Sequence, residues 1–146
     1  MKKMLNLSFF VFSFFIYAKG QNIDNAIYLS NPNGKLELKL NKIYEKYTFD
    51  SNPIILFEDV KFVKIINTQF DIPALLIQLN KKGSEDLKRI THLNKGKNLG
   101  LVFEGKLIAA PLINDEILDG EFAISGDITI EELKKIEKYI QKKMKH

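Results

Sequence analysis

The 146-residue chain contains no cysteine. This absence excludes disulfide bonds, thiolate nucleophiles, zinc sites with cysteine ligands and lipid anchors attached through cysteine. The fold must therefore be stabilised by its hydrophobic core alone. A chain of this length can achieve that, because a domain of about 150 residues buries about two-thirds of the surface that its unfolded chain exposes.

Histidine is scarce, and the sequence shows none of the common catalytic patterns. His92 and His146 are the two histidines. Neither has a carboxylate at a sequence spacing that would indicate a catalytic pair, so no Ser-His-Asp triad is predicted. Gly96-x-x-x-Gly100 lacks the Lys-Ser/Thr pair of a phosphate-binding loop. The acidic residues between 115 and 127 do not have the spacing of a calcium loop and are interpreted as a solvated loop. We therefore expect no enzyme activity, no cofactor and no metal site.

Positive charge is nearly balanced outside the first twenty residues. The chain has a formal net charge of +4, and without Lys2, Lys3 and Lys19 the remainder carries +1. Such a small excess does not favour a nucleic-acid-binding surface. The basic run 142–145 is interpreted as the solvated end of a helix, where cations suit the helix dipole. Contact with anionic lipid or acidic polypeptide is the alternative for this run.

The long apolar run of the chain lies at its N-terminus. Two lysines precede the run from Leu5 to Ala18, and Ala18-Lys19-Gly20 places small residues where a signal peptidase reads. This layout predicts a secretory signal peptide over residues 1–20, cleaved before Gln21. An uncleaved anchor is the alternative, although the run is shorter than the about 20 apolar residues of a transmembrane helix. We expect a mature protein in the periplasm or outside the cell, without a membrane span after cleavage.

The remainder has the balance of a folded globular protein, since 45% of the residues are hydrophobic and 27% are charged. Apolar or alternating runs predict strands at residues 35–40, 44–49, 61–66, 74–79, 99–103, 106–110 and 121–125. The two-residue turn Glu104-Gly105 predicts a hairpin. Ser84 is the expected cap of a helix that ends near Leu93, and Thr129 with Glu132 fits the capping box of a second helix. These elements predict a two-layer α+β sandwich, in which a mainly antiparallel sheet carries two amphipathic helices on one face.

The second half of the chain carries a spaced pattern of polar residues, glycines and an Ala-Pro pair. The pattern reads Thr91-x-x-Asn94-x-Gly96, an apolar strand, Glu104-Gly105, Ala110-Pro111, Gly120, Ile124-Ser125-Gly126 and Thr129-x-x-Glu132. It resembles the signature of the periplasmic head domain of SecD, a protein-export factor, over about residues 53–142. The departures are small: Glu104 stands where Asp is usual, Ala109 where Ser is usual and Ile128 where an aromatic residue is usual.

The resemblance implies a non-catalytic domain that contacts polypeptide. Members of the SecD family carry this head on a longer periplasmic domain joined to transmembrane helices, and we expect neither part here. The expected organisation is a signal peptide at residues 1–20, a β-rich N-terminal appendage at 21–52 and a SecD head-like domain at 53–146.

The signature residues are expected mainly to maintain the fold, because glycine suits turns with positive φ and close approaches of the backbone. The signature set is Thr91, Asn94, Gly96, Gly105, Ala110, Pro111, Gly120, Gly126, Thr129 and Glu132. Contact with a partner is expected along the strand that follows the hairpin, at Leu107, Ile108, Pro111, Leu112 and Ile113.

Two functions fit these observations. In the first, the chain is an exported binding module that holds polypeptide or components of the Sec translocase on a sheet edge or in an apolar groove. In the second, the head fold is reused as a free-standing envelope domain with a structural or inhibitory role unrelated to export, since fold alone does not fix function.

Overall fold

The computed structural model describes residues 22–40 and 44–144. The predicted signal peptide and its cleavage site before Gln21 lie outside the described residues. The elements follow in the order β1 (Ala26–Leu29), β2 (Leu36–Lys39), β3 (Lys46–Phe49), β4 (Ile55–Leu56), the 3-10 helix η1 (Phe57–Asp59), β5 (Val60–Asn67), β6 (Pro73–Leu79), α1 (Lys81–Leu93), β7 (Leu99–Phe103), β8 (Lys106–Ala109), β9 (Glu121–Ser125) and α2 (Ile130–Lys143). Among these residues, no helix has the length and apolar character needed to cross a membrane.

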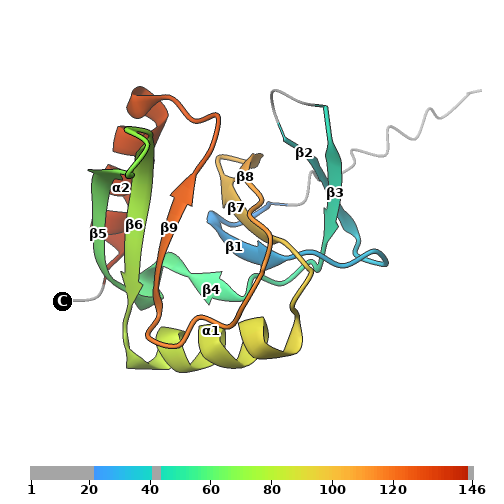
Figure 1. Cartoon of the computed structure of the whole chain (residues 1–146). Helices are drawn as coiled ribbons and strands as arrows, with labels where there is room; N and C mark the ends of the chain where they lie inside the picture. The colour runs from blue at the N-terminus through green and yellow to red at the C-terminus, as the bar shows by residue number, and fades with distance from the viewer. Residues whose placement is uncertain (1–21, 41–43, 145–146) are drawn as a thin grey trace, which may run out of the picture.

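The α+β class predicted from the sequence is confirmed. Within the described ranges the strands form a four-stranded sheet in the order β4-β1-β7-β8, a three-stranded sheet in the order β5-β6-β9 and the β2-β3 pair, with antiparallel pairing throughout. Helix α2 packs on β5 and β6, whereas α1 contacts β4 and β6 (Figure 1). The strands are thus divided between sheets, and the two helices lie at different places on them.

The hairpin between β7 and β8 is confirmed at the predicted turn. Glu104 and Gly105 have φ values of 49° and 73°, and Phe103 pairs with Lys106 across them. Positive φ at both central residues is the geometry of a type I′ turn, whose twist matches that of the flanking strands. The hairpin therefore brings β8 to the outside of β7, at the edge of the four-stranded sheet.

Both helices begin at side-chain caps, and one cap differs from the prediction. Asn80, not Ser84, caps α1, because its Oδ1 accepts a hydrogen bond from the Gly83 N–H at 2.9 Å. The two lysines that open α1 are exposed, so the apolar spacing used to find the helix does not reach its first turn. The capping box of α2 is confirmed: Thr129 Oγ1 accepts from the Glu132 N–H at 3.2 Å, and a Glu132 carboxylate oxygen accepts from the Thr129 N–H at 2.8 Å.

The core has two hydrophobic clusters, and β1 contributes to both. Ile27 and Leu29 belong to the larger cluster, which also contains the buried residues of α2, three residues of β6 (Leu75, Ile77 and Leu79) and three of β7 (Leu99, Leu101 and Phe103). Ala26 and Tyr28 face the smaller cluster, whose other buried members are Leu36, Leu38, Phe49, Val102 and Leu107. The predicted division of the chain near residue 53 stays a prediction, but strands from before that point pair and pack with strands from after it.

Candidate functional site

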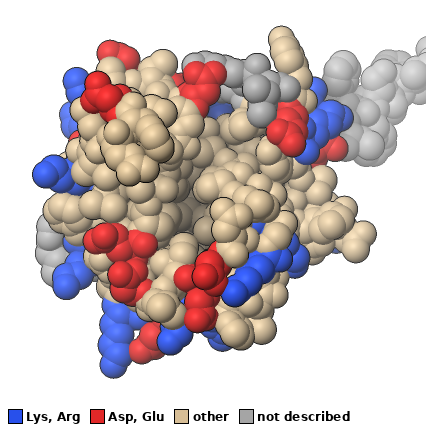
Figure 2. All heavy atoms as spheres, in the orientation of Figure 1, with Lys and Arg blue, Asp and Glu red and all other residues tan. Residues whose placement is uncertain are grey.

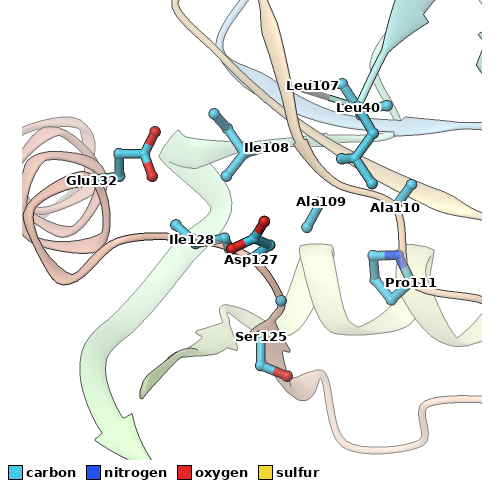
Figure 3. Close-up of a pocket in the computed structure, with 11 residues that line it drawn as sticks. Leu40, Leu107, Ile108, Ala109, Ala110, Pro111, Ser125, Asp127, Ile128 and Glu132 are labelled. Atoms are coloured by element: carbon cyan, nitrogen blue, oxygen red, sulfur yellow. The ribbon is translucent and has the colours of Figure 1, made fainter. Parts of the chain in front are cut away.

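A groove of about 340 Å³ lies between β8 with the residues that follow it and the connection from β9 to α2. Figure 2 shows this hollow near the middle of the face, walled mostly by uncharged residues. The lining residues, most of them labelled in Figure 3, are Leu40, Leu107, Ile108, Ala109, Ala110, Pro111, Ser125, Gly126, Asp127, Ile128 and Glu132. The two walls come from different sheets, so the groove exists only in the folded chain.

One wall of the groove contains the edge strand β8, and the other begins at Ser125, the last residue of the edge strand β9. In the described ranges, β8 pairs with β7 alone among the strands of its sheet, and β9 pairs with β6 alone. Leu107, at the start of the β8 wall, also forms an isolated parallel bridge with Leu40. Edge strands present backbone N–H and C=O groups that an added strand can pair with. The groove therefore combines a concave surface with the backbone edge of β8 and the end of β9.

The floor of the groove is apolar. Leu107 and Ala109 are buried, with 1% and 5% of their surface exposed, and Ile108 and Ile128 are partly buried against the larger cluster. An apolar floor favours the burial of hydrophobic side chains, at about 25 cal/mol for each Å² removed from water. The arrangement is suited to binding an apolar side chain.

The α2 side of the groove is acidic. Asp127 and Glu132 line it, and Figure 3 shows the Asp127 carboxylate on the side of Ala109 and the Glu132 carboxylate turned toward the segment that carries Ile108. Glu132 is held in place because its carboxylate accepts from both the N–H and the hydroxyl of Thr129, at 2.8 and 3.0 Å. Among the described residues that line the groove, none is Lys or Arg.

The structure separates the five residues predicted to contact a partner. Leu107, Ile108 and Pro111 line the groove. Leu112 is 52% exposed but does not line it, and Ile113 is buried in the core with 4% exposure. Leu112 and Ile113 lie beyond the end of β8 at Ala109, where Leu112 forms an isolated bridge with Asn98. The role of these residues in partner binding stays a prediction.

Sequence reasoning missed the opposite wall, formed by the segment from Ser125 to Ile128 with Glu132. The sequence placed Gly126 and Glu132 among the signature residues expected to maintain the fold, and Asp127 among the acidic residues of a solvated loop. No local pattern brings this segment next to β8, because the contact depends on how the two sheets pack against each other.

The polar signature residues around α1 make contacts within the chain. Thr91 is fully buried, and its Oγ1 donates to the Leu87 carbonyl at 2.8 Å and accepts from the Ile117 N–H at 2.9 Å. The Asn94 side-chain amide donates to the Ile90 carbonyl at 2.8 Å at the end of α1. These bonds fix the helix end and the connection that leads to β9.

The signature glycines lie at turns. Gly96 and Gly105 have φ values of 87° and 73°, which favour glycine. Gly120 has φ 72°, and a Cβ at this position would lie 2.0 Å from Ser84 Oγ, so the α1 side chain leaves room only for hydrogen. Gly126, with the signature pair Ala110 and Pro111, lines the groove.

Two carboxylates of the acidic loop before β9 each lie beside a basic side chain. Asp115 lies 2.7 Å from the Lys95 ammonium, and Glu116 lies 3.0 Å from His92 Nδ1. The hydrogen bond from Lys95, with a further bond from the Glu116 N–H, lowers the pKa of Asp115 below its ordinary value. In the described part of the chain, no group of three or more His, Cys, Asp or Glu side chains is placed to hold a metal ion.

Comparisons with known proteins agree on one family. The model of the SecDF P1 head subdomain matches residues 36–142, so the match begins inside the segment predicted as an appendage. The protein translocase subunit SecD of Sebaldella termitidis is 32% identical over 112 residues, which are 76% of this chain and 27% of that protein. SecD of Rickettsia prowazekii is 31% identical over 123 residues, covering 82% of this chain and 24% of that protein. The chain thus spans about a quarter of the length of these relatives.

Solved structures show the same fold. A crystal structure of SecDF in a super-membrane-facing form has a TM-score of 0.66 at 17% identity, over 82% of this chain and 18% of that chain. A second structure, of a membrane component SecDF that enhances protein export, has a TM-score of 0.59 at 24% identity, over 66% of this chain and 43% of that one. With the family match over residues 36–142, these findings confirm the resemblance inferred from the signature: the chain belongs to the SecDF P1 head subdomain family.

Proposed function

We propose that this chain acts in protein export by binding an extended stretch of polypeptide in the groove between β8 and β9. The observation that carries the proposal is an apolar groove that contains the edge strand β8 on one side and the end of the edge strand β9 on the other. Relatives named as protein translocase subunits, and a solved relative described as enhancing protein export, support export as the context.

Strand addition is the proposed mode of binding. An extended polypeptide rises about 3.3 Å per residue, so about three of its residues can align with the stretch from Ile108 to Ala110. The added strand ends there, because Pro111 has no N–H to donate and its carbonyl accepts from the Leu99 N–H. Backbone hydrogen bonds to the edge hold any sequence, while alternate side chains reach the apolar floor at Leu107 and Ala109. A binding mode that depends mainly on the backbone suits a protein that handles many different export substrates.

The proposed affinity is low. A short added strand makes few hydrogen bonds, each with a net value of about 1 kcal/mol, and it loses conformational freedom on binding. We expect a Kd on the order of 100 μM, which corresponds to about 5–6 kcal/mol. Rapid release at this affinity allows a moving chain to pass through the groove.

The proposed site of action lies in the periplasm or outside the cell, as the predicted signal peptide of residues 1–20 indicates. Partners in this proposal are exported polypeptides and, through them, components of the Sec translocase. The proposal concerns binding, and it does not extend the activity of the whole SecD protein to this chain, which spans about a quarter of it.

Photo-crosslinking in living cells tests the proposal. A photoreactive amino acid at Ile108 or Pro111 lies in the groove, whereas one at Leu118 lies on a surface that is 62% exposed and outside the groove lining. We expect crosslinks to newly exported polypeptides from the two groove positions and not from the control. Equal crosslinking from all three positions, or none from the groove, contradicts the proposal.

A deletion strain separates the proposal from a structural role in the envelope. We expect slower export of secretory proteins, measured by pulse–chase, when the gene is deleted. Normal export kinetics together with an altered envelope would favour a free-standing domain unrelated to export.

A further inference from the structure

The three-stranded sheet β5-β6-β9 has one face toward the core and one outer face. Val63, Leu75 and Ile77 lie on the core face, where they belong to the larger hydrophobic cluster and α2 packs on β5 and β6 (Figure 1). Successive side chains of a strand point to opposite faces of its sheet. The residues next to these three therefore point outward, away from α2.

The outer face of this sheet is apolar at its centre. Phe62, Ile66 and Leu76 lie on it, and in the described ranges none of the three belongs to either core cluster or packs against one. Phe62 is 46% exposed, and the turn that joins β5 to β6 adds Phe70 and Ile72, which are 75% and 45% exposed. Large apolar side chains gathered on an exposed surface mark an interaction site.

The neighbouring edge of β5 is closed by α2. In the described part of the chain β5 is an edge strand of its sheet, but the Ile65 N–H donates to Glu137 Oε1 at 3.1 Å. An added strand cannot pair at Ile65 without displacing that carboxylate. The outer face of the sheet, and not its β5 edge, is therefore the surface open to a partner.

The apolar centre lies between charges of opposite sign. Lys64 on β5 and Glu121 on β9 are both exposed, and the central strand β6 separates them. Their pairing partners on β6 are Leu76 and Gln78, so both point to the outer face. Neither forms a salt bridge with another described residue. The face thus presents a cation on one side and an anion on the other.

We propose that this outer face binds the same face of a second copy of the chain in a two-fold symmetric dimer. A two-fold axis parallel to β6 places β5 of one copy over β9 of the other, so that each Lys64 lies near Glu121 of the second copy. An axis perpendicular to the strands places β5 over β5, and repulsion between the two Lys64 side chains disfavours it. The charges therefore favour both a second copy as the partner and one orientation of it.

The size of the face predicts a weak dimer. Three strands about 4.8 Å apart and about 20 Å long give a face of about 300 Å² in each copy. With the exposed turn, the two copies bury about 800 Å² in total, which is less than the about 1,200 Å² of a stable interface. We expect a Kd on the order of 100 μM and a monomer–dimer equilibrium that depends on concentration.

This inference goes beyond the proposed function, because it concerns a surface outside the groove. Phe62, Ile66, Leu76, Lys64 and Glu121 are not among the residues that line the groove. Polypeptide binding and self-association can therefore be tested with separate variants.

Charge reversal and its compensation test the dimer. Sedimentation equilibrium of the purified full chain, from about 10 μM to about 1 mM, gives the Kd. Lys64→Glu and Glu121→Lys each bring like charges together twice in the symmetric dimer, so each should raise the Kd about tenfold. The variant with both changes restores opposite charges and should return to within about threefold of the original Kd.

Lys88→Glu is the matched control, because Lys88 is exposed on α1 and undergoes the same change of charge. We expect it to leave the Kd unchanged. Thermal unfolding of each variant shows that its fold is retained, since all three positions are exposed. High salt should raise the Kd of the original chain and reduce the differences among the variants, because exposed charges are screened.

Three outcomes overturn the inference. The first is a chain that stays monomeric up to about 1 mM. The second is association of equal strength in the original chain, both single variants and the double variant, because it then arises outside this face. The third is flotation of the monomer with vesicles of anionic phospholipid that Lys64→Glu abolishes, which would make a lipid surface the occupant. None of these outcomes bears on peptide binding in the groove.

Discussion

Replacement of Phe49 by alanine tests whether the N-terminal strands are part of the head domain's core. Phe49 ends β3 and has no exposed surface. Its ring lies so close to β7 that a Cβ at Gly100 would be 2.5 Å from Phe49 Cε1. It also stacks on Tyr47, with ring centroids 6.2 Å apart. The side chain thus joins the β2-β3 pair to the four-stranded sheet.

The expected cost follows from the cavity that the substitution leaves. Truncation of a buried Phe to Ala destabilises proteins by about 3–5 kcal/mol, and a domain of this kind has a total stability of about 5–15 kcal/mol. Phe49→Ala therefore removes a large share of the free energy of unfolding and lowers the Tm by about 10–20 °C. Gly100 cannot fill the space, because it has no side chain.

Urea unfolding followed by circular dichroism measures this cost, since the chain has no Trp for fluorescence. Tyr44→Ala is the matched control, because Tyr44 is 85% exposed, and it should change the stability by less than about 0.5 kcal/mol. A loss below about 1 kcal/mol for Phe49→Ala, or a separate early transition that leaves the remaining strands folded, would refute the reasoning. Such a result would instead favour the independent appendage predicted from the sequence.

Two further predictions concern a signature glycine and the acidic loop. Gly120→Ala should destabilise the fold by about 2–5 kcal/mol, because the new side chain combines a positive φ with a clash against Ser84. Gly105 also has a positive φ but faces open space, so Gly105→Ala should cost about 1–2 kcal/mol in the same unfolding assay. Similar costs for the two would show that the Ser84 contact is unimportant. The Asp115 carboxyl, whose pKa is lowered by Lys95, should titrate below its ordinary value of 3.8 in an NMR titration, and Lys95→Met should move it upward. Because the pKa of Asp115 is lower in the folded than in the unfolded chain, the ion pair contributes to stability above about pH 4, and this contribution is lost as the pH falls through the folded pKa. An unchanged Asp115 titration in the Lys95→Met variant would contradict the ion pair.

Local sequence patterns predicted the local structure well. The Glu104-Gly105 turn and the Thr129–Glu132 capping box depend on neighbouring residues, and both are confirmed. The cap of α1 was missed because Asn80 stands before a first turn of exposed lysines, where the apolar spacing of the helix is absent. Short-range chemistry therefore identified most elements, and the family signature identified the domain.

Arrangements that depend on distant pairing could not be predicted. Strand β1 lies between β4 and β7. All four of its residues are buried, so no alternation of buried and exposed residues indicates which strands it pairs with. The groove is a second example, because one wall contains β8 of the four-stranded sheet and the other follows β9 of the three-stranded sheet. The predicted contact strand contained the first wall, and the sequence pattern did not show that the signature segment around Gly126 faces it.

NMR of the isotope-labelled full chain with an extended peptide of about ten mainly apolar residues tests the central claim most directly. If the peptide binds by strand addition, cross-strand NOEs should join its backbone to β8 near Ile108 and to the end of β9 near Ser125, and amide exchange should slow at both edges. NOEs confined to the exposed surface of α1 around Leu93, with unchanged exchange at β8 and β9, would contradict the account.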